Sequence, residues 1–265
     1  MIDYSRYKFA KVEKKDKVAV LTLNRPETIN AIGTEEHLEL GTIFQDLDDD
    51  EEVNAVIITG AGRAFSAGGD VNTMIEHFNN PSLRPSMAQV KRIVESLVAL
   101  RKPIIAALNG DCTGLAATIA LHCDMIYAVE KARIGDPHLR VGIVPGDGGC
   151  LIWPLQLSMC KAKEYLMTGD LVRAPEAERM GLINRVVPAE DLMEEAWKLA
   201  KGFADGPIEA ISYTKVCLNK ILQERINLLY DATVAYEYHS LHSEDHLEAA
   251  QAFLEKRAPQ FKGKI

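Results

Sequence analysis

Apolar residues along the chain form two recurring patterns, which are short apolar runs and longer segments with helical spacing. Residues 8–23 alternate polar and apolar positions around Lys14-Lys15-Asp16, which predicts a β-hairpin. The predicted buried strands are 55–59, 104–108 and 125–128. The predicted helices are 34–47, 86–100, 116–121, 208–221, 226–238 and 243–257. Alternation of short strands with helices predicts an α/β fold.

The pattern changes after Asp205-Gly206-Pro207, where only helical spacing remains. We therefore expect an α/β core over residues 1–205 and an all-helical C-terminal region over residues 206–265. Thr34 and Ser243 precede helical segments and are expected to cap them, because their hydroxyl groups can accept from free backbone N–H groups. The polar segment 79–85 lies between a turn and a helix, and we expect a mobile lid there.

Two glycine-bearing turns follow two of the predicted strands. The first turn covers residues 64–70 (AFSAGGD), and the second covers residues 109–115 (NGDCTGL) before an Ala-rich helical stretch. In both, a buried strand leads into a turn whose backbone N–H groups can face outward at the start of a helix. Two such donors that converge would form an oxyanion hole. The alternative is that both turns merely connect a strand to a helix.

Charge and length limit the possible partners. The 265 residues carry a formal net charge of −8, which argues against nucleic acid as a partner, although local basic residues could hold a small phosphorylated ligand. No apolar run approaches the ~20 residues that cross a bilayer, and the charged start lacks the apolar core of a signal peptide. We therefore expect a cytoplasmic protein without a membrane partner.

Three histidines close together raise the question of a metal site. His239, His242 and His246 lie within eight residues, but Ser243 followed by Glu244 is typical of a capped helix start. We expect no bound metal.

Several segments resemble one superfamily in their order and spacing. They are Leu23-Asn24-Arg25-Pro26, residues 64–70, residues 102–110 with Cys123-Asp124, residues 142–146, residues 166–169 with 174–184, and residues 253–257. Together they resemble the enoyl-CoA hydratase/isomerase (crotonase) superfamily. The resemblance implies a crotonase-like spiral of ββα units, a C-terminal helical region for trimerisation, and a homotrimer or a dimer of trimers. It also implies an acyl-CoA thioester as ligand, with coenzyme A as part of the substrate and no tightly bound cofactor.

The resemblance also assigns roles to individual residues. The two N–H donors of the oxyanion hole fall at Gly69 and Leu115. The coenzyme A contacts would come from Ala67, Gly68 and Asp70 in the first turn, from Arg25, and from Phe253 and Lys256 near the C-terminus. Arg25 would reach a phosphate, while Ala67 and Gly68 would lie along the adenine and pantetheine.

The chain departs from the hydratases of this family at two catalytic positions. They have one glutamate where this chain has Thr118 and a second where it has His138. Addition of water to an enoyl bond needs one group that removes a proton and another that delivers one. The Thr118 hydroxyl is too weak an acid or base for either task at neutral pH. Hydratase chemistry by the family mechanism is therefore not expected.

A histidine and aspartates stand near these positions instead. Asp136-Pro137-His138 and Asp147, with Trp153-Pro154, look like the pattern of the β-diketone hydrolases of the superfamily, such as 6-oxocamphor hydrolase. A histidine held by a carboxylate is a competent base at neutral pH. The hypothesis is a retro-Claisen hydrolysis in which His138, held by Asp147, activates water, while Gly69 and Leu115 stabilise the leaving enolate.

Other interpretations stay open at this point. His138 and Asp147 could be loop residues, with Asp147 making Asx-type turn bonds. We expect His122 to be a packed helix residue. His77 and Glu76 could line the acyl pocket, but a solvated helix face is expected for both. The competing functions are an enoyl-CoA hydratase or double-bond isomerase, in which His138 shuttles a proton, and a non-catalytic acyl-CoA binding protein.

Overall fold

The main sheet of the molecule has six strands. The computed structural model describes residues 2–263. The strands run in the order β1 (Ala10–Lys15), β2 (Val18–Leu23), β3 (Ala55–Gly60), β4 (Ile104–Leu108), β6 (Met125–Val129) and β9 (Arg185–Val187). β1 and β2 pair antiparallel, and every later pair is parallel. β3 and β4 are buried along their whole length, as expected of parallel strands covered on both faces.

A second, smaller sheet joins loops that follow the main strands. Its strands run in the order β5 (Cys112–Thr113), β7 (Arg133–Gly135) and β8 (Leu171–Arg173). Sequence periodicity did not predict these strands, because two or three residues are too few to show an alternation.

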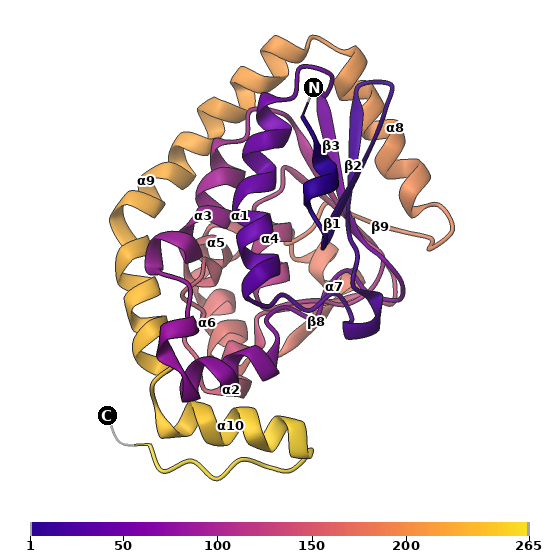
Figure 1. Ribbon diagram of the computed structural model, residues 1–265. Coiled ribbons are helices and arrows are strands. Elements are labelled where there is room, and N and C mark those ends of the chain that lie inside the picture. Colours follow the sequence, from indigo (N-terminus) through magenta and orange to yellow (C-terminus); the bar gives the residue numbers. More distant parts are fainter. Residues whose placement is uncertain (1, 264–265) are drawn as a thin grey trace.

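Ten α-helices complete the described part of the chain. They are α1 (Thr34–Asp49), α2 (Val71–Asn79), α3 (Met87–Ala99), α4 (Leu115–Leu121), α5 (Gly149–Gln156), α6 (Met159–Thr168), α7 (Ala174–Arg179), α8 (Leu192–Asp205), α9 (Ile208–Ser240) and α10 (Glu244–Glu255). Short 3-10 helices span Tyr4–Arg6, Pro26–Thr28, Pro81–Leu83 and Pro137–Val141. The main sheet has α8 on one side and α1 with α3 on the other (Figure 1). The expected α/β fold with a helical C-terminal region is confirmed.

The predicted hairpin and several helix ends are confirmed. Lys15 pairs with Val18 across a turn in which Asp16 and Lys17 both have positive φ. Ser86 and Ser243 cap α3 and α10 through side-chain hydrogen bonds. Thr34 was the wrong residue for the cap of α1, because the helix already includes it and Gly33 precedes it.

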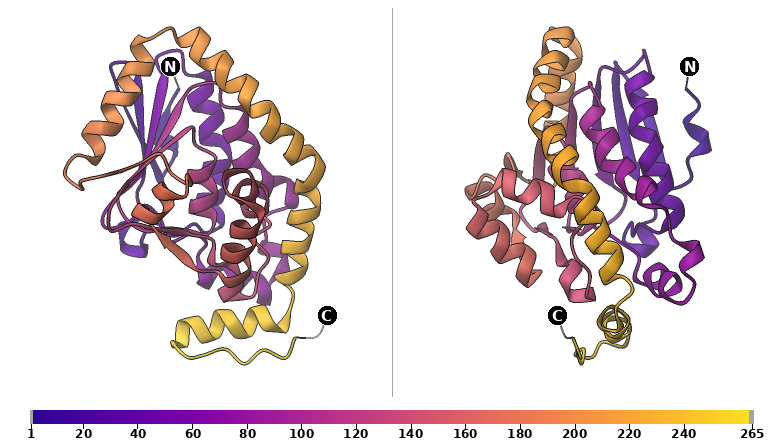
Figure 2. Two further views of the ribbon diagram at one scale, coloured as in Figure 1. Left: turned by 180° about the vertical axis from the view of Figure 1, so that it is seen from behind. Right: turned by 90° about the vertical axis from the view of Figure 1, so that its left-hand side faces the viewer.

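The two helices expected over 208–221 and 226–238 are one helix, α9, of 33 residues. Residues 222–225 (LQER) are all good helix formers, so nothing in them interrupts the backbone hydrogen bonds. Its buried residues Ile226, Tyr230 and Val234 recur every four positions and pack with residues of α3 and α5. The helix runs along the outer side of the molecule to the end where α10 lies (Figure 2). α10 in turn packs on α2 and on the 3-10 helix Pro137–Val141.

The segment that was expected to be a lid contains the 3-10 helix Pro81–Leu83 between α2 and α3. Within the part of the chain that the structure describes, no helix is both long and apolar enough to cross a bilayer.

Candidate active site

The two glycine-bearing turns pack against each other. The N–H of Phe65 donates to the Asp111 carbonyl at 3.1 Å, and the N–H of Thr113 donates to the Ser66 carbonyl at 3.2 Å. Gly68 has φ +81°, and a Cβ atom there would lie 2.4 Å from the Thr113 carbonyl oxygen. Only glycine tolerates both the positive φ and this close approach of two backbones.

Asn30 fixes the first turn from beneath. Its fully buried side-chain amide donates to three carbonyl groups, those of Ala61, Ala64 and Phe65, at 2.9 to 3.1 Å. The Ser66 hydroxyl donates to the Asn30 carbonyl at 2.7 Å and accepts from the N–H of Gly68 at 3.1 Å. The turn is therefore rigid before any ligand binds, which is what a preorganised donor needs.

The two expected oxyanion donors line one cavity. Gly69 ends the first turn and Leu115 begins α4, and both residues contribute to the wall of the same inner cavity. Within residues 2–263, neither backbone N–H donates a hydrogen bond to any acceptor. Each is therefore available to an oxygen atom of a ligand.

The inner cavity has a volume of about 110 Å³ and opens beside a larger outer cleft of about 680 Å³. Gly69, Met74 and His138 line both spaces and mark the junction between them. A long ligand could therefore lie in the outer cleft and extend a short group past Gly69 into the inner cavity.

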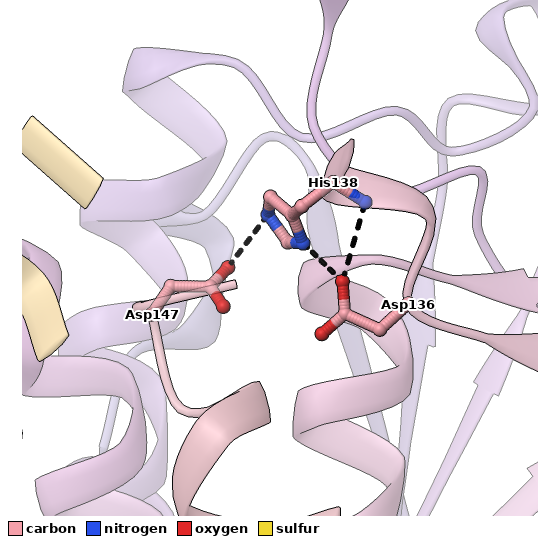
Figure 3. A group of neighbouring side chains, drawn as sticks. All are labelled: Asp136, His138 and Asp147. Carbon is pink, nitrogen blue, oxygen red and sulfur yellow. Dashed lines mark hydrogen bonds and ion pairs between the residues drawn. The ribbon is translucent and has the colours of Figure 1, made fainter. Parts of the chain in front are cut away.

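His138 lies between two buried aspartates (Figure 3). Its Nδ1–H donates to Oδ1 of Asp136, and its Nε2 lies 3.4 Å from Oδ2 of Asp147. Asp136 caps the 3-10 helix Pro137–Val141 and also accepts from the backbone N–H of His138 at 3.4 Å. Asp136 thus fixes the ring orientation, a task that we had expected Asp147 to perform alone. Asp147 faces the opposite ring nitrogen.

The two carboxylates change the protonation of the ring. Burial lowers the pKa of His138, but the charges of Asp136 and Asp147 outweigh it and raise that pKa well above its ordinary value. Burial raises the pKa of Asp147, and the His138 charge more than reverses this, so that the pKa of Asp147 is lowered. These two directions favour an imidazolium beside a carboxylate. Asp147 is therefore a candidate base in addition to His138, which the sequence hypothesis had named as the base.

Glu237, which the sequence did not single out, brings a third carboxyl group to the inner cavity. Its Oε2 is buried and has no hydrogen-bond partner within the described chain. Burial and the nearby charge of Asp147 raise the pKa of Glu237 well above its ordinary value. The group is therefore a protonated carboxylic acid that lines the same cavity as a carboxylate, and such a pair suits acid and base catalysis.

Thr118 lies one turn behind Leu115 on α4 and lines neither cavity. It is fully buried, and its methyl group packs against Gly148, where a Cβ atom would lie 2.7 Å from it. His122, one turn further, is a packed residue whose Nδ1–H donates to the Thr118 carbonyl at 2.7 Å. The structure thus does not bring Thr118 to the reacting end of the site.

A buried histidine and a half-buried one also line the inner cavity. Burial lowers the pKa of His37 to about 4, so this ring is neutral, and its Nδ1 has no partner within the described residues. His77, which we had expected on a solvated helix face, lines the cavity and its Nε2 lies 2.9 Å from the Thr34 hydroxyl. Glu76 lines neither cavity.

The expected coenzyme A contacts divide into two groups. Ala67 and Phe253 line the outer cleft, Gly68 lies directly beside Ala67, and Asp70 lines the inner cavity while it caps α2. Arg25 forms an ion pair with Glu36, and neither Arg25 nor Lys256 lines either cavity. The cationic residues along the outer cleft are Arg63, Lys131, Arg133 and Arg140. Sequence reasoning missed them because only the fold brings the turn with Arg63, the turn with Lys131, β7 with Arg133 and the 3-10 helix with Arg140 to one cleft.

Asp136, His138 and Asp147 also have donor atoms within 4.8 Å of one another, which is the spacing of a metal site. Both ring nitrogens already face a carboxylate oxygen, so protons alone account for the arrangement. His239, His242 and His246 do not form a cluster of ligands. Nδ1 of His246 donates to the Val141 carbonyl at 2.6 Å, while His242 contacts Arg84.

Comparisons with known proteins agree with one another. The model of the family "Enoyl-CoA hydratase/isomerase" matches residues 13–264. A probable enoyl-CoA hydratase of Mycobacterium bovis is 35% identical over 259 residues, which cover 96% of this chain and 98% of that protein. A short-chain-enoyl-CoA hydratase of Clostridium acetobutylicum is 36% identical over 251 residues, which cover 93% of this chain and 94% of that protein. The crystal structure of an enoyl-CoA hydratase/isomerase from Mycobacterium paratuberculosis superposes on this chain with a TM-score of 0.88 at 36% identity. The match covers 92% of this chain and 97% of that chain.

Proposed function

We propose a reaction for this chain from one premise, which is that it belongs to the enoyl-CoA hydratase/isomerase family. It is an enzyme of the crotonase superfamily that acts on an acyl-CoA thioester. The proposed reaction is the hydrolytic cleavage of a carbon–carbon bond in a β-ketoacyl-CoA, a retro-Claisen reaction. The products are a carboxylic acid and a shorter acyl-CoA.

One observation carries this proposal, namely that His138 lies between two buried aspartates at the junction of the two cavities. An aspartate–imidazolium–aspartate array can take up a proton from water and stabilise an adjacent oxyanion. A hydratase of this family uses two glutamates instead, and the corresponding residues here are Thr118 and His138. The unpartnered N–H groups of Gly69 and Leu115 support an enolate intermediate.

In the proposed reaction, the thioester oxygen accepts from the N–H groups of Gly69 and Leu115, and the β-ketone lies in the inner cavity. The oxygen of a water molecule bonds to the ketone carbon while Asp147 takes the water proton. The charged His138 stabilises the resulting alkoxide. Collapse of this alkoxide breaks the bond to the α-carbon, and the electron pair moves into the thioester as an enolate.

The enolate must then be protonated at its α-carbon. Glu237 is the proposed donor, because its carboxyl group is neutral and lines the same cavity. The proton that Asp147 took from water restores Glu237, so that one water molecule is consumed and no other reactant is needed.

The relatives' names favour a second candidate function. They are named enoyl-CoA hydratases, and a crotonyl-CoA hydratase of Syntrophomonas wolfei is 34% identical over 251 residues. In this function Asp147 and Glu237 would be the base and the acid for addition of water to an enoyl bond. A double-bond isomerase or a binding protein without activity remain the further alternatives.

Assembly is a separate proposal. Exposed apolar side chains along α9, among them Tyr213, Leu218 and Ile221, support the expected association of three copies through the C-terminal region.

Mass spectrometry of the products distinguishes these functions. The purified protein is incubated with crotonyl-CoA and, separately, with a β-ketoacyl-CoA. We expect the β-ketoacyl-CoA to yield a shorter acyl-CoA plus a carboxylic acid, with one oxygen from ¹⁸O-labelled water in the acid. A gain of water by crotonyl-CoA without any cleavage of the ketoester would favour the hydratase instead, and binding without either change would favour the binding protein.

Glu237→Gln tests the proposed acid through two readouts. Because the pKa of Glu237 is raised, wild-type kcat/KM should fall as the pH rises through that pKa, and the variant should lose this limb along with about 10²-fold in activity. The neutral Glu237 side chain contributes fully to the stability of the fold below its unfolded pKa near 4.5, and this contribution is lost as the pH rises through the folded pKa. At pH 8 the free energy of unfolding of the variant should therefore exceed that of wild type by more than about 1 kcal/mol. At pH 4 the two free energies of unfolding should be equal. An unaltered pH profile in the variant would exclude Glu237 as the acid.

A further inference from the structure

A cationic side chain lines the inner cavity. Arg84 follows the 3-10 helix Pro81–Leu83 and contributes to the inner cavity but not to the outer cleft. Gly69, Met74 and His138 are the residues that the two spaces share. Arg84 therefore lines the inner cavity away from the residues that the two spaces share, and a group that enters this cavity can reach it.

The Arg84 guanidinium has few partners in the folded chain. Its Nε–H donates to the His77 carbonyl at 2.8 Å, and Nη1 contacts the ring of His242. Across residues 2–263, no carboxylate oxygen lies within 4.0 Å of this guanidinium, and Nη2 makes no hydrogen bond. Partial burial lowers the pKa of Arg84.

A second donor beside Arg84 also lacks a partner. The Tyr238 hydroxyl is buried, lines the inner cavity and has no hydrogen-bond partner in the described chain. Arg84 and Tyr238 are linked through His242, because Nη1 of Arg84 contacts the His242 ring and Nδ1 of that ring donates to the Tyr238 carbonyl at 2.5 Å. Arg84 and Tyr238 thus form a pair of donors on the wall of the inner cavity.

We propose that Arg84 and Tyr238 bind a carboxylate at the far end of the substrate's acyl group. The substrate is then the coenzyme A thioester of a short dicarboxylic acid. A carboxylate has two oxygen atoms, one for Nη2 of Arg84 and one for the Tyr238 hydroxyl. Charge-assisted hydrogen bonds of this kind are about twice as strong as neutral ones.

The size of the cavity limits the length of this group. A cavity of about 150 Å³ holds benzene, with six carbon atoms. The inner cavity of about 110 Å³ therefore has room for a chain of about four or five non-hydrogen atoms. Apolar residues Ile32, Val90 and Ile143 line it as well, so the chain between the thioester and the carboxylate is an aliphatic one.

The proposal rests on the proposed function only in taking an acyl-CoA thioester as ligand. It can therefore be tested by the affinity for thioesters that the enzyme does not cleave. Titration calorimetry compares succinyl-CoA with butyryl-CoA and glutaryl-CoA with pentanoyl-CoA, two pairs matched in chain length. We expect wild type to bind at least one dicarboxylic thioester about ten- to a hundredfold more tightly than its neutral counterpart. Arg84→Gln should remove this preference, Arg84→Lys should keep part of it, and Tyr238→Phe should reduce it.

Affinity for the neutral thioesters shows whether each variant is folded. If Arg84→Gln binds butyryl-CoA like wild type and has lost only the preference, the proposal stands even where no β-ketoester is cleaved. Equal wild-type affinities within both pairs would overturn it, and so would a preference that survives in Arg84→Gln. Where Arg84→Gln is unstable, Tyr238→Phe decides by the same comparison.

Discussion

Replacement of His138 by alanine should lower the turnover of a β-ketoacyl-CoA by at least about 10³-fold, while the affinity for unreactive butyryl-CoA stays near that of wild type. The variant lacks the cation that lies between Asp136 and Asp147, so neither the alkoxide nor the proton transfer is supported. The backbone donors at Gly69 and Leu115 are unaffected, and the outer cleft loses only the His138 ring at its junction with the inner cavity. Steady-state kinetics and calorimetry measure the two quantities separately.

The same substitution should also affect stability, because it leaves two buried carboxylates without a counter-charge. Loss of one partner from such an array typically costs about 3–5 kcal/mol at neutral pH, and part of this should return at pH 5 as a carboxylate takes up a proton. Urea denaturation at both pH values tests this. His138→Gln is the matched control for shape, since it is neutral but fills the space. Full turnover in either variant would contradict the role of His138.

Asp147→Asn should lower kcat by about 10²- to 10⁴-fold, the range of a general base, with a smaller change in substrate affinity. The asparagine has the same shape but cannot accept a proton from water. Loss of one of the two carboxylates that face His138 should also lower the pKa of the ring towards its ordinary value. NMR titration of His138 measures that shift independently of turnover.

Asp231→Asn is the control for this charge change. Its replacement makes the same change from aspartate to asparagine, but Asp231 on α9 is exposed and lines neither cavity. Its loss should leave turnover unchanged. If Asp147→Asn retained wild-type kcat, the water would have to be activated by another group.

The sequence predicted the parts of the fold that rest on local patterns. The hairpin of β1 and β2, the buried strands β3 and β4, and the serine cap of α10 follow from alternation, apolar runs and side-chain chemistry. The strands β5, β7 and β8 hold together through contacts between distant segments, and no local pattern predicts those. The continuous α9 was divided wrongly because its buried positions are few and widely spaced.

Local patterns also account for the site residues that were predicted, and contacts between distant segments account for those that were missed. Gly68 stands out in the sequence because a backbone that approaches another backbone needs glycine. Asp136 had a signal that was not used, since an aspartate two residues before His138 with proline between them is a capping pattern. Glu237 and Arg84 had none, because a glutamate or an arginine in a polar stretch looks the same whether or not it becomes buried.

The length of α9 has a consequence for how this scaffold could change its chemistry. Near the start of that helix Lys215 pairs with Asp124, which directly precedes β6, and its last two turns carry Glu237 and Tyr238 into the inner cavity. The turns proposed to bind the enolate and the residue proposed to protonate it thus belong to segments more than a hundred positions apart. If related enzymes differed only in the last two turns of α9, they would differ in proton delivery and substrate choice. They would still activate the thioester in the same way.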